Sequence, residues 1–77
     1  MPTIGWQHKN RFGTWRILRD RKGWNAYWND EHLGHYDRDD KALDDLVGGH
    51  TFPTSSGINS GDCGLPEELA DWDEISR

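Results

Sequence analysis

The feature that most constrains the fold is a pair of aromatic-rich segments separated by a short turn. Residues 14–20 (Thr-Trp-Arg-Ile-Leu-Arg-Asp) and residues 24–29 (Trp-Asn-Ala-Tyr-Trp-Asn) flank Arg21-Lys22-Gly23. Aromatic and β-branched residues favour strands. A three-residue loop that ends in glycine favours a hairpin. The sequence therefore predicts a β-hairpin over residues 14–29.

The length of this loop also predicts the register of the hairpin. A three-residue loop would pair Asp20 with Trp24 and would place Leu18 opposite Ala26. Side chains alternate across a strand, so the predicted pairs divide into two faces. The first face holds Arg16, Leu18, Trp24, Ala26 and Trp28, and the second holds Trp15, Ile17, Arg19, Asn25, Tyr27 and Asn29.

Two further strands are predicted beside the hairpin. Ile4 and Trp6 alternate like a short strand, and residues 33–36 (Leu-Gly-His-Tyr) follow a turn at residues 29–32. The chain is therefore expected to form an antiparallel sheet of three, possibly four, strands.

A helix is predicted at about residues 38–47. Asp37 is a favourable N-cap, and acidic residues in the first turn suit the helix dipole. Gly48 and Gly49 are typical of a helix end. Apolar residues recur at helical spacing and form one stripe: Ala42, Leu43, Leu46 and Val47. The predicted fold class is α+β, with one helix packed on a face of the sheet.

The C-terminal part is expected to be a loop followed by a docked acidic tail. Residues 50–64 are rich in glycine, serine and threonine, and Pro66 can begin a helical turn or two. Apolar residues recur every three or four positions on this acidic segment: Leu65, Leu69, Trp72 and Ile75. We predict a single domain over residues 1–77, with a sheet-plus-helix core at 14–49 and an acidic, partly helical extension at 50–77.

Composition limits the size of the core and the compartment. A chain of 77 residues buries only about 60–65% of its unfolded surface, and 32% of these residues are hydrophobic. Five tryptophans compensate, because each ring buries a large apolar area. No apolar run is long enough to span a membrane, and Cys63 has no second cysteine to pair with. These features favour a protein of the cytoplasm without a membrane partner.

Charge is divided unequally along the chain. Residues 1–28 hold six Lys or Arg residues and one Asp, whereas residues 29–77 hold three Lys or Arg residues and thirteen acidic residues. One interpretation is a basic nucleic-acid surface with an acidic appendage. The other is that the two halves attract each other within one fold.

Residues 23–30 (Gly-Trp-Asn-Ala-Tyr-Trp-Asn-Asp), 33–37 and 41–43 resemble the AP2 domain and the related N-terminal arm domains of phage integrases. The resemblance covers residues 14–47. It implies that Trp24, Ala26 and Trp28 pack under the helix, and that the opposite sheet face meets the DNA major groove. The DNA-facing positions would then hold Trp15, Arg19, Asn25, Tyr27 and Asn29. In size and composition the chain is also similar to small accessory proteins of bacteria and phages.

Metal-binding and catalytic residue types are sparse. The candidates for zinc are His32, His35, His50 and Cys63, and their spacing does not match a paired-ligand site. Cys63 and His50 could form a nucleophile and base, but residues 61–64 favour a turn rather than a nucleophile elbow. The sequence therefore predicts no metal, no cofactor and no enzymatic activity.

The second hairpin face is too apolar to be left in water. The C-terminal residues, a protein partner or second copy, or a nucleic acid could each cover it. We predict a non-catalytic, regulatory or inhibitory protein-binding function through Trp15, Ile17, Arg19, Asn25, Tyr27 and Asn29. The net charge of −5 favours a basic partner. The alternative is nucleic-acid binding through this face and the basic hairpin residues Arg19, Arg21 and Lys22.

Overall fold

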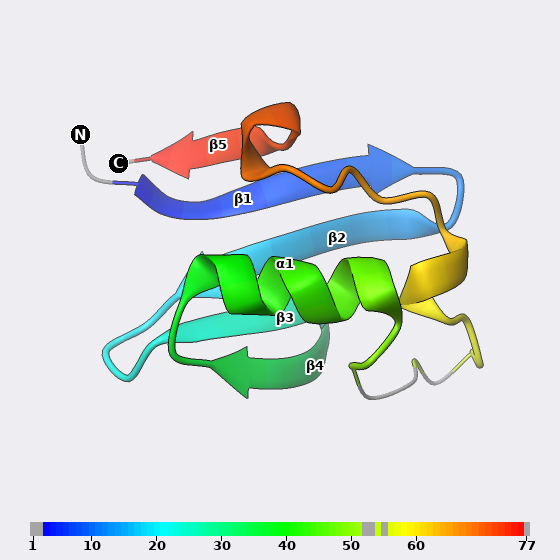
Figure 1. Cartoon of the computed structure of the whole chain (residues 1–77), viewed down its shortest axis with the longest axis horizontal. Coiled ribbons are helices and arrows are strands. Elements are labelled where there is room, and N and C mark those ends of the chain that lie inside the picture. The colour runs from blue at the N-terminus through cyan, green and yellow to red at the C-terminus, as the bar shows by residue number, and fades with distance from the viewer. Residues whose placement is uncertain (1–2, 52–53, 55, 77) are drawn as a thin grey trace.

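Five antiparallel strands form one sheet in the order β4-β3-β2-β1-β5 in the computed structural model, which describes residues 3–51, 54 and 56–76. The strands are β1 (Thr3–Asn10), β2 (Gly13–Arg19), β3 (Trp24–Trp28), β4 (Glu31–Tyr36) and β5 (Asp73–Ser76). Strands β1 to β4 form a meander, and β5 returns to pair with the outer side of β1 (Figure 1). The α+β class and the antiparallel sheet are confirmed, with one strand more than predicted.

The predicted register of β2 against β3 is wrong by one residue. Arg19, not Asp20, pairs with Trp24. Asp20 belongs to the turn, because its N–H donates to the Gly23 carbonyl (2.8 Å) and its carboxylate accepts the Lys22 N–H (2.8 Å). This is the local bonding by which Asp favours turns. A shift of one residue moves every β2 side chain to the other face of the sheet.

The core therefore lies between the helix and a different set of β2 residues. Trp15 and Ile17, rather than Arg16 and Leu18, join β3 under the helix, and both are 0% exposed. Ala26 is buried beside them, in agreement with the predicted orientation of β3. The buried core consists of Trp15, Ile17, Ala26, Leu33, Ala42, Leu43, Leu46, Cys63, Leu65 and Trp72.

The helix α1 (Asp39–Gly48) buries the predicted apolar stripe but begins one residue late. Its N-cap is Arg38, so the prediction of Asp37 as N-cap is wrong. The Arg38 guanidinium donates to Asp40 at 2.6 Å, which holds the chain in the first turn. Gly49 ends the helix in the left-handed region (φ 74°), as expected for a glycine C-cap.

The C-terminal segment contains less helix than predicted and ends in a strand that was not predicted. It contains two short 3-10 helices, Ser60–Asp62 and Leu69–Asp71, and then β5. Pairing with β1 satisfies the backbone groups of β5. A short isolated helix at this position would be only marginally stable. Residues 52, 53 and 55 of the predicted loop lie outside the described residues.

Trp72 anchors this segment to the core. Its side chain is 4% exposed, and its indole N–H donates to the Pro66 carbonyl at 3.0 Å. It shares the core with Trp15, so the segment packs on the same side of the sheet as α1 (Figure 1). None of the helices in the described part of the chain is long and apolar enough to cross a membrane.

Candidate functional site

The side of the sheet opposite α1, called here the open face, is the first candidate site. Both α1 and the C-terminal segment pack on the other side, and no element of the described chain packs over this face. The strand registers and the alternation of side chains assign these residues to it: Gly5, Gln7, Lys9, Thr14, Arg16, Leu18, Asn25, Tyr27, His32, His35, Asp73 and Ile75.

The structure separates the predicted partner-binding residues. Asn25 and Tyr27 lie on the open face. Trp15 and Ile17 are buried under α1, and Arg19 lies on the helix side at the end of β2. The face predicted for these three residues is wrong because the register assumed for β2 was shifted by one residue.

An apolar row crosses the middle of the open face. Leu18 pairs with Gly5, which in turn pairs with Ile75 on β5, and both aliphatic side chains are half-buried. The Leu18 side chain lies over the glycine, because a Cβ built on Gly5 would be 2.7 Å from Leu18 Cδ2. This row and the half-buried Tyr27 ring supply the apolar part of the face.

Polar side chains beside this row are fixed by a chain of contacts. Asn25 is 7% exposed, donates to the Asp20 carboxylate (2.7 Å) and bonds through its Oδ1 to Nε2 of His32 (2.9 Å). The His32 ring meets Tyr27 edge-on, with centroids 5.3 Å apart. His35 Nε2 lies 3.9 Å from Asp20. The hydrogen bond from Asn25, with a smaller one from a backbone N–H, lowers the pKa of Asp20.

A bulge in β4 brings its two histidines to one face. His32 and His35 are three residues apart and would point to opposite sides of a regular strand. The pairing shifts between Ala26 and Tyr27, and Leu33 and Gly34 are consecutive buried residues. No pattern in the sequence indicates this bulge, because it depends on the pairing of β4 with β3.

Arg16 is a member of the open face that the sequence prediction missed. Its Nε donates to Gln7 (3.0 Å), and Nη1 lies 3.4 Å from the Asn29 carbonyl. Asn29 stands in the β3–β4 turn with φ of 52°, and its side chain accepts the Thr14 N–H. The guanidinium is therefore held over the sheet between β1 and β3.

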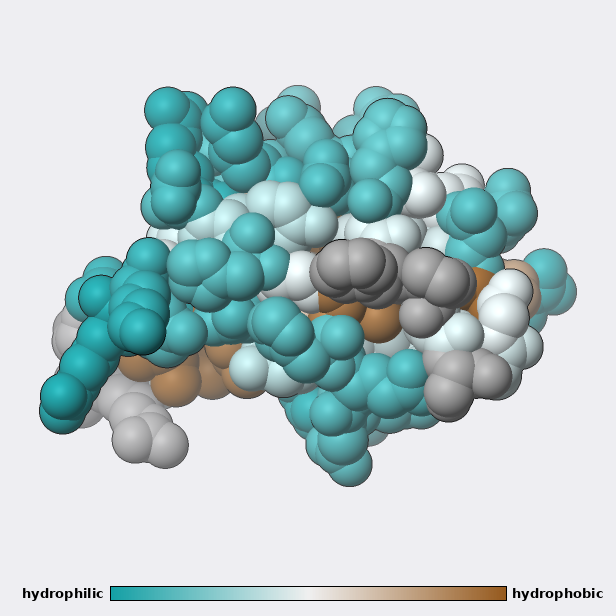
Figure 2. Space-filling model, turned by 90° about the horizontal axis from the view of Figure 1, so that it is seen from below, coloured by the Kyte–Doolittle hydropathy of each residue, from teal (hydrophilic) through white to brown (hydrophobic). Residues whose placement is uncertain are grey.

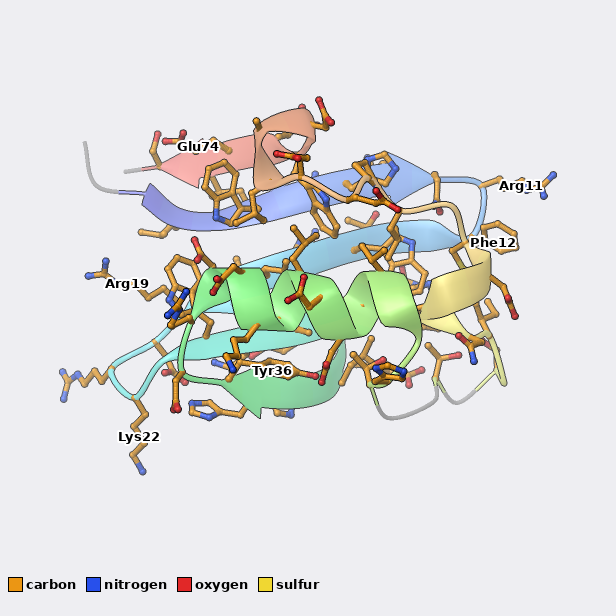
Figure 3. The ribbon with its side chains drawn as sticks, in the orientation of Figure 1. Arg11, Phe12, Arg19, Lys22, Tyr36 and Glu74 are labelled. Atoms are coloured by element: carbon orange, nitrogen blue, oxygen red, sulfur yellow. The ribbon has the colours of Figure 1, made fainter. Side chains whose placement is uncertain are left out.

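The residues of the predicted nucleic-acid site lie at one end of the molecule. Arg21 and Lys22 belong to the exposed turn between β2 and β3, next to Arg19. Figure 3 shows Arg19 and Lys22 extending into solvent at this end, while Arg11 extends at the other. These cations therefore do not line the centre of the open face.

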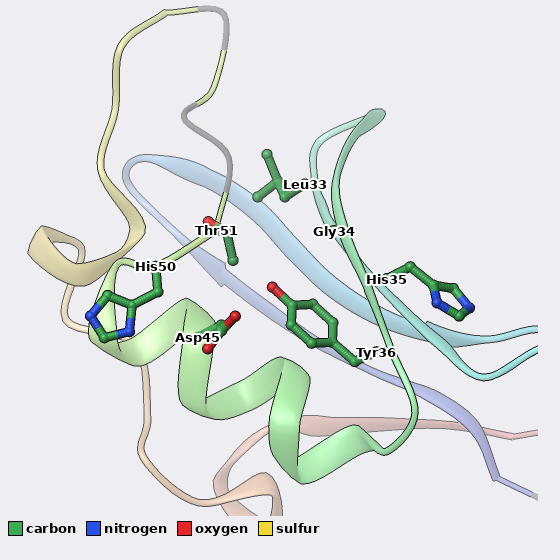
Figure 4. Close-up of a pocket in the computed structure, with 7 residues that line it drawn as sticks. All are labelled: Leu33, Gly34, His35, Tyr36, Asp45, His50 and Thr51. Carbon is green, nitrogen blue, oxygen red and sulfur yellow. The ribbon is translucent and has the colours of Figure 1, made fainter.

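A second candidate site is a pocket of about 300 Å³ between β4 and the end of α1 (Figure 4). The Tyr36 hydroxyl donates to the Asp45 carboxylate there. Burial, then this bond and the carboxylate charge, raise the pKa of Tyr36 to about 12. Gly34 accommodates the phenol, since a Cβ there would lie 2.8 Å from Tyr36 Oη. The lining residues are Leu33, Gly34, His35, Tyr36, Asp45, His50 and Thr51.

Asp45→Asn is expected to lower the pKa of Tyr36 from about 12 but to leave it above 10, since burial is the largest cause of the shift. Phenolate absorbance in a Tyr27→Phe background follows Tyr36 alone. Because the folded pKa is raised, this group stabilises the fold below pH 10 and the contribution is lost as the pH rises through about 12. An unchanged midpoint in the Asp45→Asn variant would show that the two side chains do not interact.

Cys63, which was considered as a nucleophile but not predicted to be one, is buried. Its thiol donates to the Asn59 carbonyl (3.3 Å), and burial raises its pKa, which disfavours the reactive thiolate. The Cys63 carbonyl accepts the side-chain N–H of Asn10, so this residue links the C-terminal segment to the β1–β2 turn. Within the described ranges, no three His, Cys, Asp or Glu side chains are grouped to hold a metal ion.

A scan against protein-family models finds no match, and searches of curated proteins and of solved structures find none either.

Proposed function

We propose that this chain is a small non-catalytic accessory protein that binds a protein partner through its open face and so regulates or inhibits it. One observation carries the proposal. The helix and the C-terminal segment pack on the same side of the sheet, while Leu18, Tyr27 and Ile75 remain on the other side. An apolar row flanked by tyrosine and arginine is typical of the anchor residues of protein interfaces.

The arrangement favours a protein over a nucleic acid. Its polar side chains are held by bonds to one another, as in Arg16 with Gln7 and Asn25 with Asp20, which reduces the entropy lost on binding. The carboxylates of Asp20 and Asp73 stand at two sides of the face and repel phosphate. A protein surface can instead place donors against these carboxylates.

Cross-linking tests this assignment directly. A photoreactive phenylalanine analogue replaces Tyr27 in one variant and the exposed helix residue Asp44 in the other, both expressed in the source cells. The proposal predicts a discrete protein adduct from position 27 that position 44 does not give. It also predicts that Arg16→Ala in the position-27 variant removes the adduct.

Two results would contradict the proposal. The first is the same set of adducts from both positions, which would indicate random encounters. The second is cross-linking of nucleic acid from position 27, reduced by Lys22→Ala, which would support the alternative function.

A further inference from the structure

β4 is an edge strand of the sheet, and among the described residues no strand pairs with the outer side of residues 34–36. In the strand order β4-β3-β2-β1-β5, β4 has a neighbour on one side only. Residues 34–36 pair regularly with β3 beyond the bulge, so this part of the edge is straight enough to continue a ladder. Figure 2 views the molecule from this edge, which is largely hydrophilic with a few hydrophobic patches. An exposed edge of this kind is a template for another strand.

The pocket beside this edge is suited to one long side chain. Its volume of about 300 Å³ lies at the lower limit for ligand sites, and β4 itself forms one wall. The Tyr36 ring supplies apolar surface, and Asp45 supplies a carboxylate opposite it (Figure 4). A side chain with an aliphatic stem and a cationic end matches both features.

The charges around the pocket favour a cation as well. Asp45 accepts from a neutral phenol, and among the described residues no lysine or arginine forms an ion pair with it. Asp30 and Asp37 flank the two ends of β4 and are exposed. These carboxylates disfavour pairing of β4 with a second copy of the same acidic edge and favour a basic segment.

We propose that the β4 edge binds an extended basic segment of a partner protein by strand addition. A lysine or arginine of that segment enters the pocket, its stem lies along the Tyr36 ring, and its charge meets Asp45. This site is distinct from the open face and does not depend on it.

Short capped peptides of alternating threonine and valine test the proposal with the full chain. One carries a central lysine, a second norleucine and a third glutamate, and a fourth is the lysine peptide N-methylated so that it cannot pair as a strand. Amide chemical shifts should move in residues 31–36 and 45–51. The lysine peptide should bind about tenfold more tightly than the norleucine peptide, and N-methylation should abolish binding.

Two variants identify the pocket as the cause. Asp45→Asn should remove the preference for lysine, whereas Asp44→Asn, on the exposed side of the same helix, should keep it. Tyr36→Phe also removes the bond between Tyr36 and Asp45 but keeps the ring, and it should keep strand addition. It therefore controls for a folding defect that loss of this bond would cause in Asp45→Asn. Equal binding of lysine and norleucine peptides, shifts confined to the open face, or self-association through β4 in sedimentation would each overturn the proposal.

Discussion

Trp15→Ala is expected to lower the free energy of unfolding by about 3–5 kcal/mol. The indole is 0% exposed, packs against Trp28 with centroids 6.3 Å apart, and donates to Asn10 at 3.2 Å. The total stability of a small domain is about 5–15 kcal/mol. The substitution should therefore remove a large part of the stability and shift the midpoint of urea denaturation, followed by circular dichroism, to a much lower concentration.

Tyr27→Ala is the matched control for this substitution. Tyr27 is half-buried on the open face, so the expected loss is about 1 kcal/mol or less. A register that pairs Asp20 with Trp24 would put Trp15 and Tyr27 on one face and would predict similar losses. Comparable effects of the two substitutions would therefore contradict the pairing of Arg19 with Trp24.

Trp72→Ala is expected to cost about 3–5 kcal/mol as well, although the residue lies only a few positions from the end of the chain. The substitution removes a core side chain that is 4% exposed, together with the bond to Pro66 and the ring contact with His8. Amide hydrogen exchange should accelerate first in β5 and in the facing residues of β1, because Trp72 immediately precedes β5.

Asp71→Ala is the control, since Asp71 is exposed beside Trp72 and its loss should change the unfolding free energy by about 0.5 kcal/mol or less. A small effect of Trp72→Ala, with unchanged exchange in β1, would mean that the C-terminal segment does not contribute to the core.

The sequence predicted the elements whose pattern is local. The helix was predicted from its apolar stripe (Ala42, Leu43 and Leu46) and from the glycines at its end. Both signals are local, because helical periodicity and capping act within a few residues. The strand at residues 33–36 and the orientation of Ala26 toward the helix were also correct.

The errors arose where a single side chain or a distant segment decides the structure. Asp20 accepts a turn N–H instead of extending β2, and this one bond reverses the faces of Arg16 and Ile17. An aspartate two residues before Lys22 is a local signal for such a turn and could have been used. The pairing of β5 with β1 joins segments at opposite ends of the chain, which periodicity cannot show.

The same errors affected the prediction of the candidate site. Arg16 was assigned to the core side, so the open face was predicted from Trp15 and Ile17 instead. The pocket between Tyr36 and Asp45 depends on how the end of α1 lies against β4, a packing relationship that residue spacing does not specify.

In the structure, α1 and the C-terminal segment cover one side of the sheet and leave the other side open. Nuclear magnetic resonance with a soluble paramagnetic relaxation agent tests it most directly. The structure predicts strong relaxation at the Leu18 methyl groups and the Tyr27 ring, and weak relaxation at Ile17 and the Trp15 indole. Strong relaxation at Trp15 and Ile17, with Leu18 and Tyr27 protected, would contradict it.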